Sequence, residues 1–117
     1  MAIKYVDLDD YYEPVTTDQE IFVDVKYGDG QPGVHHVFLG KEHKGSNNKV
    51  KLGKKADVKG QRSLISATVH DILEETNWTS ILVVVTEGTY KKEYGWYKSQ
   101  APNHLDTVIY NLNLIIP

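Results

Sequence analysis

The chain contains no cysteine. Disulfide bonds, thiolate zinc sites and cysteine nucleophiles are therefore all excluded. Proline is scarce, with four copies in 117 residues, and the longest apolar run covers only residues 81–85. A membrane-spanning helix needs roughly 20 apolar residues, so we expect no membrane insertion.

Sequence motifs of common enzyme classes are also missing. There is no Gly-x-Ser-x-Gly nucleophile turn and no Gly-x-x-x-x-Gly-Lys-Ser/Thr phosphate loop. The run Gly28-Asp29-Gly30 lies in an expected hairpin loop, whereas dinucleotide binding places its glycines between a strand and a helix. Sixteen acids could supply paired carboxylates, but their spacing singles out no pair. We expect a protein that is not an enzyme and needs no cofactor.

Composition is otherwise that of an ordinary globular domain. Hydrophobic residues make up 40% and charged residues 25% of the chain. A chain of this length forms one domain, which we place at 1–117. The first residues run straight into an alternating pattern and lack the apolar stretch of a signal peptide, which predicts a cytoplasmic location.

Period-two alternation of apolar and polar residues dominates the chain and predicts β-strands. The expected strands are an N-terminal one and 19–27, 34–39, 50–52, 80–86, 90–97 and 107–116. The segment 40–48 is polar and without periodicity, so we predict an exposed, mobile loop there. Residues 81–85 are apolar on both faces and are expected at the centre of the core.

Residues 63–73 fit both a strand and a helix, because their apolar residues satisfy either period. β-Branched residues favour the strand. The sequence therefore predicts an all-β fold, a two-layer antiparallel β-sandwich of seven or eight strands. The alternative is an α+β fold with a helix near 63–76, and a small barrel is the nearest all-β competitor.

Charge is distributed unevenly along the chain. Residues 1–40 hold eight acids against two lysines, whereas residues 41–62 hold eight bases against two acids. The two segments could meet within one molecule, attract a charged partner or join separate copies, and such charges are also typical of solvated strand edges. The basic candidates for binding a partner are Lys49, Lys51, Lys54 and Lys55. The preference for lysine over arginine and the acidic chain argue against nucleic acid as the partner.

Aromatic residues supply a second set of candidates. Tyr11 and Tyr12 adjoin acids in an expected loop, and Trp78 lies in another. On the strand 90–97, alternation puts Tyr90, Tyr94 and Trp96 on the inner face and Tyr97 on the outer one. Trp78, Tyr97, Tyr11 and Tyr12 are therefore the candidates for stacking on a carbohydrate or meeting a protein.

Metal binding has two candidate sets of ligands. Asp7, Asp9 and Asp10 cluster after the first strand and could meet Asp29 or Asp71 at the end of a sandwich, an oxygen-rich arrangement suited to calcium. The cluster is not an EF-hand, because Tyr12 stands where that motif has glycine.

Histidines form the other set. His35 and His36 are neighbours on one strand and point to opposite faces, so only one of them could join His43, with His70 or His104 added by the fold. The ordinary interpretation is that these are surface or hydrogen-bonded histidines.

These observations together predict a non-enzymatic protein-interaction or structural module. It would bind a protein partner or form a homo-oligomer through its acidic and basic surfaces. The alternative is a carbohydrate- or calcium-dependent binding domain that uses Trp78, Tyr97 and residues 7–10.

Overall fold

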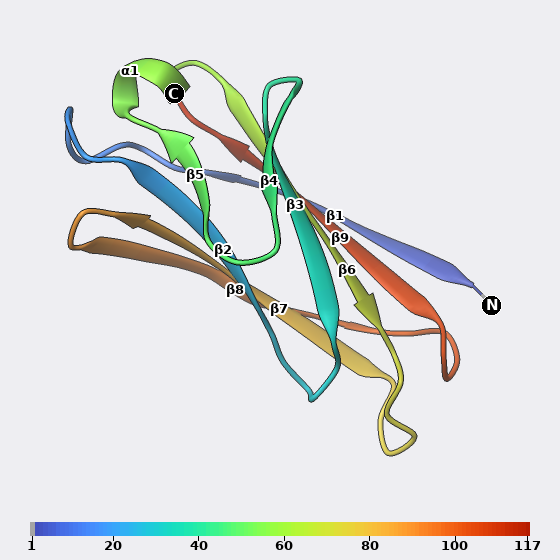
Figure 1. Cartoon of the computed structure of the whole chain (residues 1–117). Coiled ribbons are helices and arrows are strands. Elements are labelled where there is room, and N and C mark those ends of the chain that lie inside the picture. Colours follow the sequence, from blue (N-terminus) through green and yellow to red (C-terminus); the bar gives the residue numbers. More distant parts are fainter. Residues whose placement is uncertain (1) are drawn as a thin grey trace.

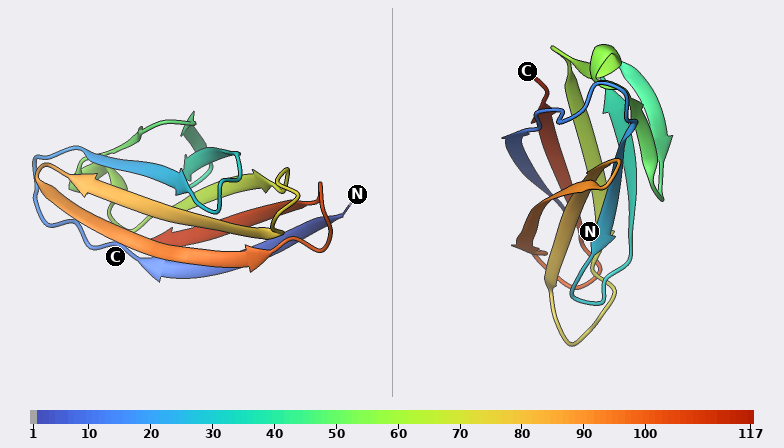
Figure 2. Two further views of the ribbon diagram at one scale, coloured as in Figure 1. Left: turned by 90° about the horizontal axis from the view of Figure 1, so that it is seen from below. Right: turned by 90° about the vertical axis from the view of Figure 1, so that its left-hand side faces the viewer.

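The computed structural model describes residues 2–117 and is a β-sandwich. Two sheets pack face to face (Figures 1 and 2). One sheet has five strands in the order β1-β9-β6-β3-β4, and the other has four in the order β5-β2-β7-β8. The predicted all-β, two-layer fold is confirmed, with nine strands in place of seven or eight.

The elements follow one another along the chain with short connections. They are β1 (Ile3–Tyr11), β2 (Ile21–Tyr27), β3 (Gly33–Leu39), β4 (Glu42–Ser46), β5 (Val50–Gly53), α1 (Lys55–Val58), β6 (Arg62–His70), β7 (Trp78–Glu87), β8 (Tyr90–Gln100) and β9 (Thr107–Ile115). All neighbouring strands pair antiparallel except β1 and β9, which are parallel.

The ambiguous segment is a strand. β6 pairs with β3 on one side and with β9 on the other. Its residues Ile65, Ala67 and Val69 are fully buried, while the residues between them face outward. The helical alternative near 63–76 is therefore wrong, because the β-branched residues fit a pleated strand with neighbours on both sides.

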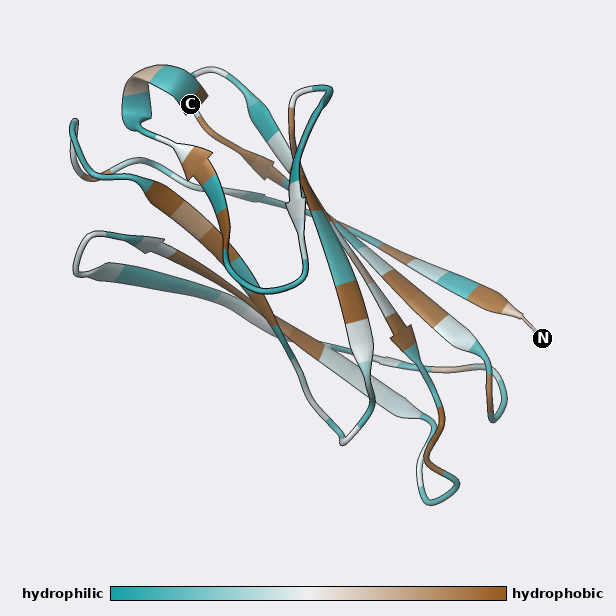
Figure 3. Cartoon of the chain, viewed as in Figure 1, coloured by the Kyte–Doolittle hydropathy of each residue, from teal (hydrophilic) through white to brown (hydrophobic). Residues whose placement is uncertain are grey.

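The core lies between the sheets and is filled by alternate residues of their strands. Apolar and polar residues alternate along several strands in Figure 3. β7 is an interior strand, and all of its residues from Ile81 to Val85 are buried. Leu82 and Val84, on its outer face, are only 7% exposed. Ile81, Val83 and Val85 thus belong to the core between the sheets, as predicted, whereas Leu82 and Val84 are buried outside it.

Two elements differ from the prediction for residues 40–58. Glu42–Ser46 is a strand, β4, rather than a loop, because its backbone pairs with β3 at the edge of the sheet where polar side chains remain solvated. The one-turn helix α1 follows β5 and directs the buried side chain of Val58 into the core. The strand predicted at 50–52 is confirmed as β5, which is an edge strand of the four-stranded sheet.

A bulge in β8 changes which aromatic residues face solvent. Gly95 is paired with Leu82 and Tyr97 with Ile81, so Trp96 is left over and the alternation shifts by one residue. Trp96 is 48% exposed, whereas Tyr97 is half-buried and packs against the core. The predicted inner position of Trp96 and outer position of Tyr97 are therefore both wrong.

Among residues 2–117, no helix is long and apolar enough to cross a bilayer.

Candidate functional site

The first strand of the acidic segment and the first strand of the basic segment are the two edge strands of the five-stranded sheet. β1, which carries Asp7 and Asp9 on its outer face, is one edge strand, and β4 is the other. Strands β9, β6 and β3 lie between them in the sheet order, and Figure 1 labels these strands. These two edges of one molecule therefore face in opposite directions, and β4 carries one acid, Glu42, and one lysine, Lys44.

The backbone of β1 is open on one side. Tyr12 N–H donates to the Ile115 carbonyl and Thr107 N–H donates to the Ala2 carbonyl, so the even-numbered residues at this edge direct their backbone groups toward β9. The odd-numbered residues of β1 then direct theirs away from the sheet. Tyr5 is 61% exposed and Ile3 is 54% exposed. This edge thus combines unpaired backbone groups with exposed apolar side chains, which is the usual template for pairing with another strand.

The far end of that edge is closed within the molecule. The Tyr11 N–H donates to Oδ1 of Asp10 over 2.8 Å, and the Tyr94 hydroxyl donates to the Tyr11 carbonyl over 2.6 Å. Near the other end, Lys4 Nζ donates to the Gln100 carbonyl over 3.2 Å. The open part of β1 is therefore its middle, around Tyr5 to Asp9.

The three predicted calcium ligands do not converge. Asp7 and Asp9 are exposed on the outer face of β1, whereas Asp10 points to the opposite face. Asp7 Oδ1 accepts a hydrogen bond from Asn111 over 3.2 Å, and Asn111 in turn accepts one from Ser66 over 2.8 Å. Asp10 lies near tyrosines of β8, where its charge adds to burial in raising the pKa of Tyr97.

The two further acids proposed for calcium lie elsewhere. Asp71 is fully buried and accepts from Gln31, and Asp29 accepts from Ser80. Within residues 2–117, no three His, Asp or Glu side chains are arranged to hold a metal ion. The prediction for Asp7, Asp9 and Asp10 assumed a loop after the first strand. These residues instead belong to β1, where neighbouring side chains point to opposite faces of the sheet.

The four lysines predicted to bind a partner lie together, beside β4. β5 is the edge strand of the second sheet and lies next to β4. Lys49 stands just before β5, with its amine 4.7 Å from the centre of the Phe22 ring, and Lys51 is within β5. Lys54 and Lys55 follow at the start of α1. The strand order therefore brings the four basic candidates to one end and side of the sandwich.

The two charged segments do not neutralise each other. β5 pairs with β2, so part of the basic segment lies beside residues of the acidic one. Nevertheless, among residues 2–117, no ion pair joins an acid of 1–40 to a base of 41–62. Lys44 pairs with Glu42 of its own strand, at 3.7 Å. Glu20, Glu42 and Asp57 line the same surface hollow as Lys44 and Lys51, so acids and bases share this part of the surface.

The aromatic candidates do not form one site. Tyr12 is 1% exposed and donates to Glu87, so it cannot contact a ligand. Tyr11 and Trp78 are exposed, at the end of β1 and the start of β7. Sequence reasoning missed Trp96, which borders a surface hollow of about 240 Å³. The isolated Gly95 inside a strand pattern was the available indication of the bulge that exposes it.

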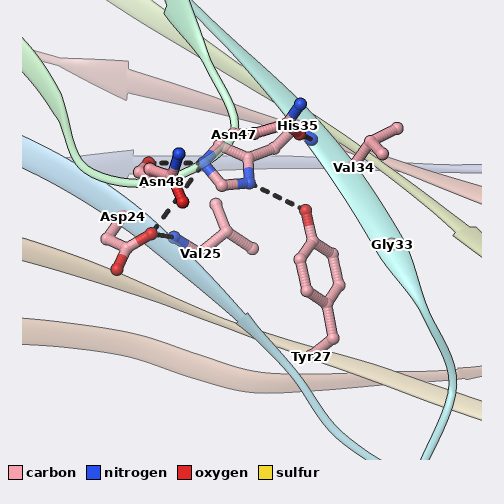
Figure 4. A pocket seen from close by; sticks show the side chains of 8 residues that line it. All are labelled: Asp24, Val25, Tyr27, Gly33, Val34, His35, Asn47 and Asn48. Atoms are coloured by element: carbon pink, nitrogen blue, oxygen red, sulfur yellow. Dashed lines mark hydrogen bonds and ion pairs between the residues drawn. The ribbon is translucent and has the colours of Figure 1, made fainter.

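A larger hollow of about 380 Å³ lies between β2 and β3, beside the β4–β5 connection (Figure 4). Its central side chain is His35, which is 2% exposed. The Tyr27 hydroxyl is 2.8 Å from His35 Nδ1, and the Asn48 carbonyl is 2.9 Å from Nε2. The carbonyl can only accept, so Nε2 carries a proton and donates to it, while Nδ1 is hydrogen-bonded to the Tyr27 hydroxyl.

This arrangement gives His35 a structural role. Both ring nitrogens are engaged, so neither offers a lone pair to a substrate or a metal ion. The backbone N–H of His35 donates to Asn47 Oδ1 over 3.1 Å, and the Asn47 N–H donates back to the His35 carbonyl. His35 therefore holds the β4–β5 connection against β3. This connection also fixes where the backbone of the following lysines begins.

Buried tyrosines predict how the fold responds to alkali. Burial raises the pKa of five tyrosines: Tyr12, Tyr27, Tyr94, Tyr97 and Tyr110. Nearby Asp24 adds to the effect of burial at Tyr27. Unfolded tyrosines ionise near pH ~10, so above that pH the folded state binds more protons and the free energy of unfolding falls.

We expect only part of the tyrosinate absorbance to develop before circular dichroism reports unfolding, and all eight tyrosines to ionise together in denaturant. Complete ionisation near pH ~10 with intact circular dichroism would contradict this.

Comparison with protein-family models, with curated proteins and with solved structures gives no significant match. The chain is therefore described by its fold class, a β-sandwich with nine strands in residues 2–117.

Proposed function

We propose that this domain is a self-associating structural module, in which the β1 edge of one copy docks beside the β4 edge of the next. The observation that supports the proposal is the strand order. β1, which carries Asp7 and Asp9, and β4, which lies beside the lysine-bearing strand β5 of the second sheet, are the opposite edges of the five-stranded sheet. Complementary patches that face in opposite directions create a head-to-tail contact, and repetition of such a contact gives a ring or a filament.

The chemistry of the two edges supports this pairing. The middle of β1 offers unpaired backbone groups together with Asp7 and Asp9, and β4 is followed by exposed Lys49 and Lys51. β4 has five residues, so backbone pairing would involve about that length of β1. The product would be a five-stranded sheet that continues from copy to copy. Charge attraction would bring the edges together and select their order.

The test exchanges charges between the two edges. The variant Asp7→Lys/Asp9→Lys makes the β1 edge basic. The variant Lys41→Glu/Lys44→Glu makes the β4 edge acidic. Each double variant alone is expected to sediment as a monomer, because both of its edges then carry charge of the same sign. An equimolar mixture is expected to assemble again, because each edge of one variant complements an edge of the other.

A matched control changes the charge by the same amount away from both edges. Glu74→Lys/Glu75→Lys, in the β6–β7 connection, should associate like the unmodified protein. For the unmodified protein, sedimentation velocity should show assembly at low salt and its loss at about 1 M salt, where the Debye length falls to about 3 Å. A monomer at low salt and high concentration would overturn the proposal, as would a mixture that stays monomeric.

A further inference from the structure

A pair of histidines on the outer face of the five-stranded sheet was not needed for the proposed assembly. His36 lies in β3 and His43 in β4, and both are exposed. His36 Nδ1 and His43 Nε2 are 3.1 Å apart. The bulge between β3 and β4 pairs Phe38 with His43, and the Phe38 ring packs edge-on against the His43 ring, with ring centres 5.1 Å apart. His43 is thus held between an aromatic ring and a second imidazole.

We propose that His36 and His43 form a two-ligand site for a divalent transition metal ion of the Zn²⁺ and Cu²⁺ type. Zinc binds imidazole nitrogen at roughly 2.0–2.1 Å, so two nitrogens on a tetrahedral ion are about 3.3 Å apart. The observed separation is close to that value. A metal ion can therefore replace the shared proton between the rings with little movement of either backbone.

The positions of the imidazole protons are compatible with replacing the hydrogen bond between the rings by a metal ion. Without a metal, one of the two facing nitrogens carries the hydrogen that bonds the other. Metal binding requires both to be unprotonated, which the neutral rings achieve by keeping their hydrogens on His36 Nε2 and His43 Nδ1. No proton is then lost from the neutral pair. Protonation of either ring in acid removes a lone pair and releases the metal.

The remaining coordination positions are open to water. His35 cannot join because both of its ring nitrogens are engaged inside the sandwich. His70 is 3.2 Å from the Thr107 hydroxyl at the end of β6, and His104 is in the β8–β9 connection. Within residues 2–117, no third His, Asp or Glu completes a metal cluster. Two imidazoles with open positions define an exchangeable site that favours nitrogen-seeking ions over Ca²⁺ or Mg²⁺.

The test is a Zn²⁺ titration of the full chain, followed through the imidazole nitrogen resonances by NMR. The expected result is saturable binding that shifts His36 Nδ1 and His43 Nε2 first, with an affinity that falls at least about tenfold in either His36→Asn or His43→Asn. His104 is also exposed, so His104→Asn serves as the control and should bind as the unmodified protein does. Absence of saturable binding would overturn the proposal, as would an affinity that neither His36→Asn nor His43→Asn lowers.

Discussion

Replacing Glu87 with glutamine is expected to lower the free energy of unfolding by about 3 kcal/mol, because a buried carboxylate that accepts several hydrogen bonds is lost. Glu87 is 1% exposed at the end of β7. Its carboxylate accepts from the Tyr12 hydroxyl over 2.6 Å, from the Thr16 N–H over 2.6 Å, and from the Val15 N–H and the Thr16 hydroxyl. An amide in its place would turn an NH₂ group toward donors that then have no acceptor.

The expected loss of stability is large because these donors fix the segment that connects the two sheets. Tyr12, Val15 and Thr16 belong to the segment that leaves β1 in one sheet and enters β2 in the other. Without Glu87, the backbone of this segment keeps unpaired polar groups close to the core. Urea unfolding at neutral pH measures the effect. Glu93→Gln, an exposed position paired with Lys91 at 3.9 Å, is the control and should change the value by less than about 0.5 kcal/mol.

The dependence on pH distinguishes this role from simple packing. Burial alone would raise the pKa of Glu87, but the hydrogen bonds from Thr16, Tyr12 and the Val15 N–H outweigh it and leave the pKa below its ordinary value. A lowered pKa in the folded state stabilises the protein above the unfolded pKa of ~4.3 and loses that contribution as pH falls through the folded value. The difference between the unmodified protein and Glu87→Gln should therefore shrink in acid. A difference independent of pH would contradict the assigned role.

The sequence predicted the sandwich because its burial pattern is regular. Ile65, Ala67 and Val69 alternate with partly exposed residues, and the apolar run from Ile81 to Val85 marks an interior strand. Both patterns follow from the same physical cause, since a residue facing the other sheet must be apolar and its neighbours need not be.

Features that depend on partners distant in the sequence were missed. β4 is polar on both faces, and only its pairing with β3 reveals it as a strand. Tyr12 was expected in an exposed loop because its neighbours are acidic. In the structure its hydroxyl donates a buried hydrogen bond to Glu87, 75 positions away in the sequence. The charged segments were visible in the sequence, but the position of β1 and β4 at opposite edges of one sheet required the strand order.

A second large effect is expected at Gln31, in the connection between β2 and β3. The side chain is 3% exposed. Its Nε2 donates to Asp71 Oδ1 over 2.8 Å, and its Oε1 accepts from the N–H groups of Ile72 and Leu73 at 3.0 and 3.2 Å. One amide therefore joins this connection to the one between β6 and β7. Gln31→Leu keeps the side-chain volume but leaves Asp71 and two backbone N–H groups without this partner, so we expect a loss of about 3 kcal/mol in the free energy of unfolding.

The variant Gln31→Glu distinguishes a hydrogen-bonding role of the Gln31 side chain from a role in packing alone. One carboxylate oxygen can still accept from Ile72 and Leu73, but the other faces Asp71 Oδ1 across the former 2.8 Å hydrogen bond. Two carboxylates at that distance repel each other unless they share a proton, so the folded state of this variant takes up a proton more readily than its unfolded chain. Its stability relative to the unmodified protein should rise as pH is lowered, because the folded state of the variant then gains the shared proton. The same two substitutions at exposed Gln100 should have little effect at any pH. Urea unfolding of Gln31→Glu across mildly acidic pH decides the matter, because a relative stability that stays constant or falls would mean that Gln31 does not hold Asp71 as described.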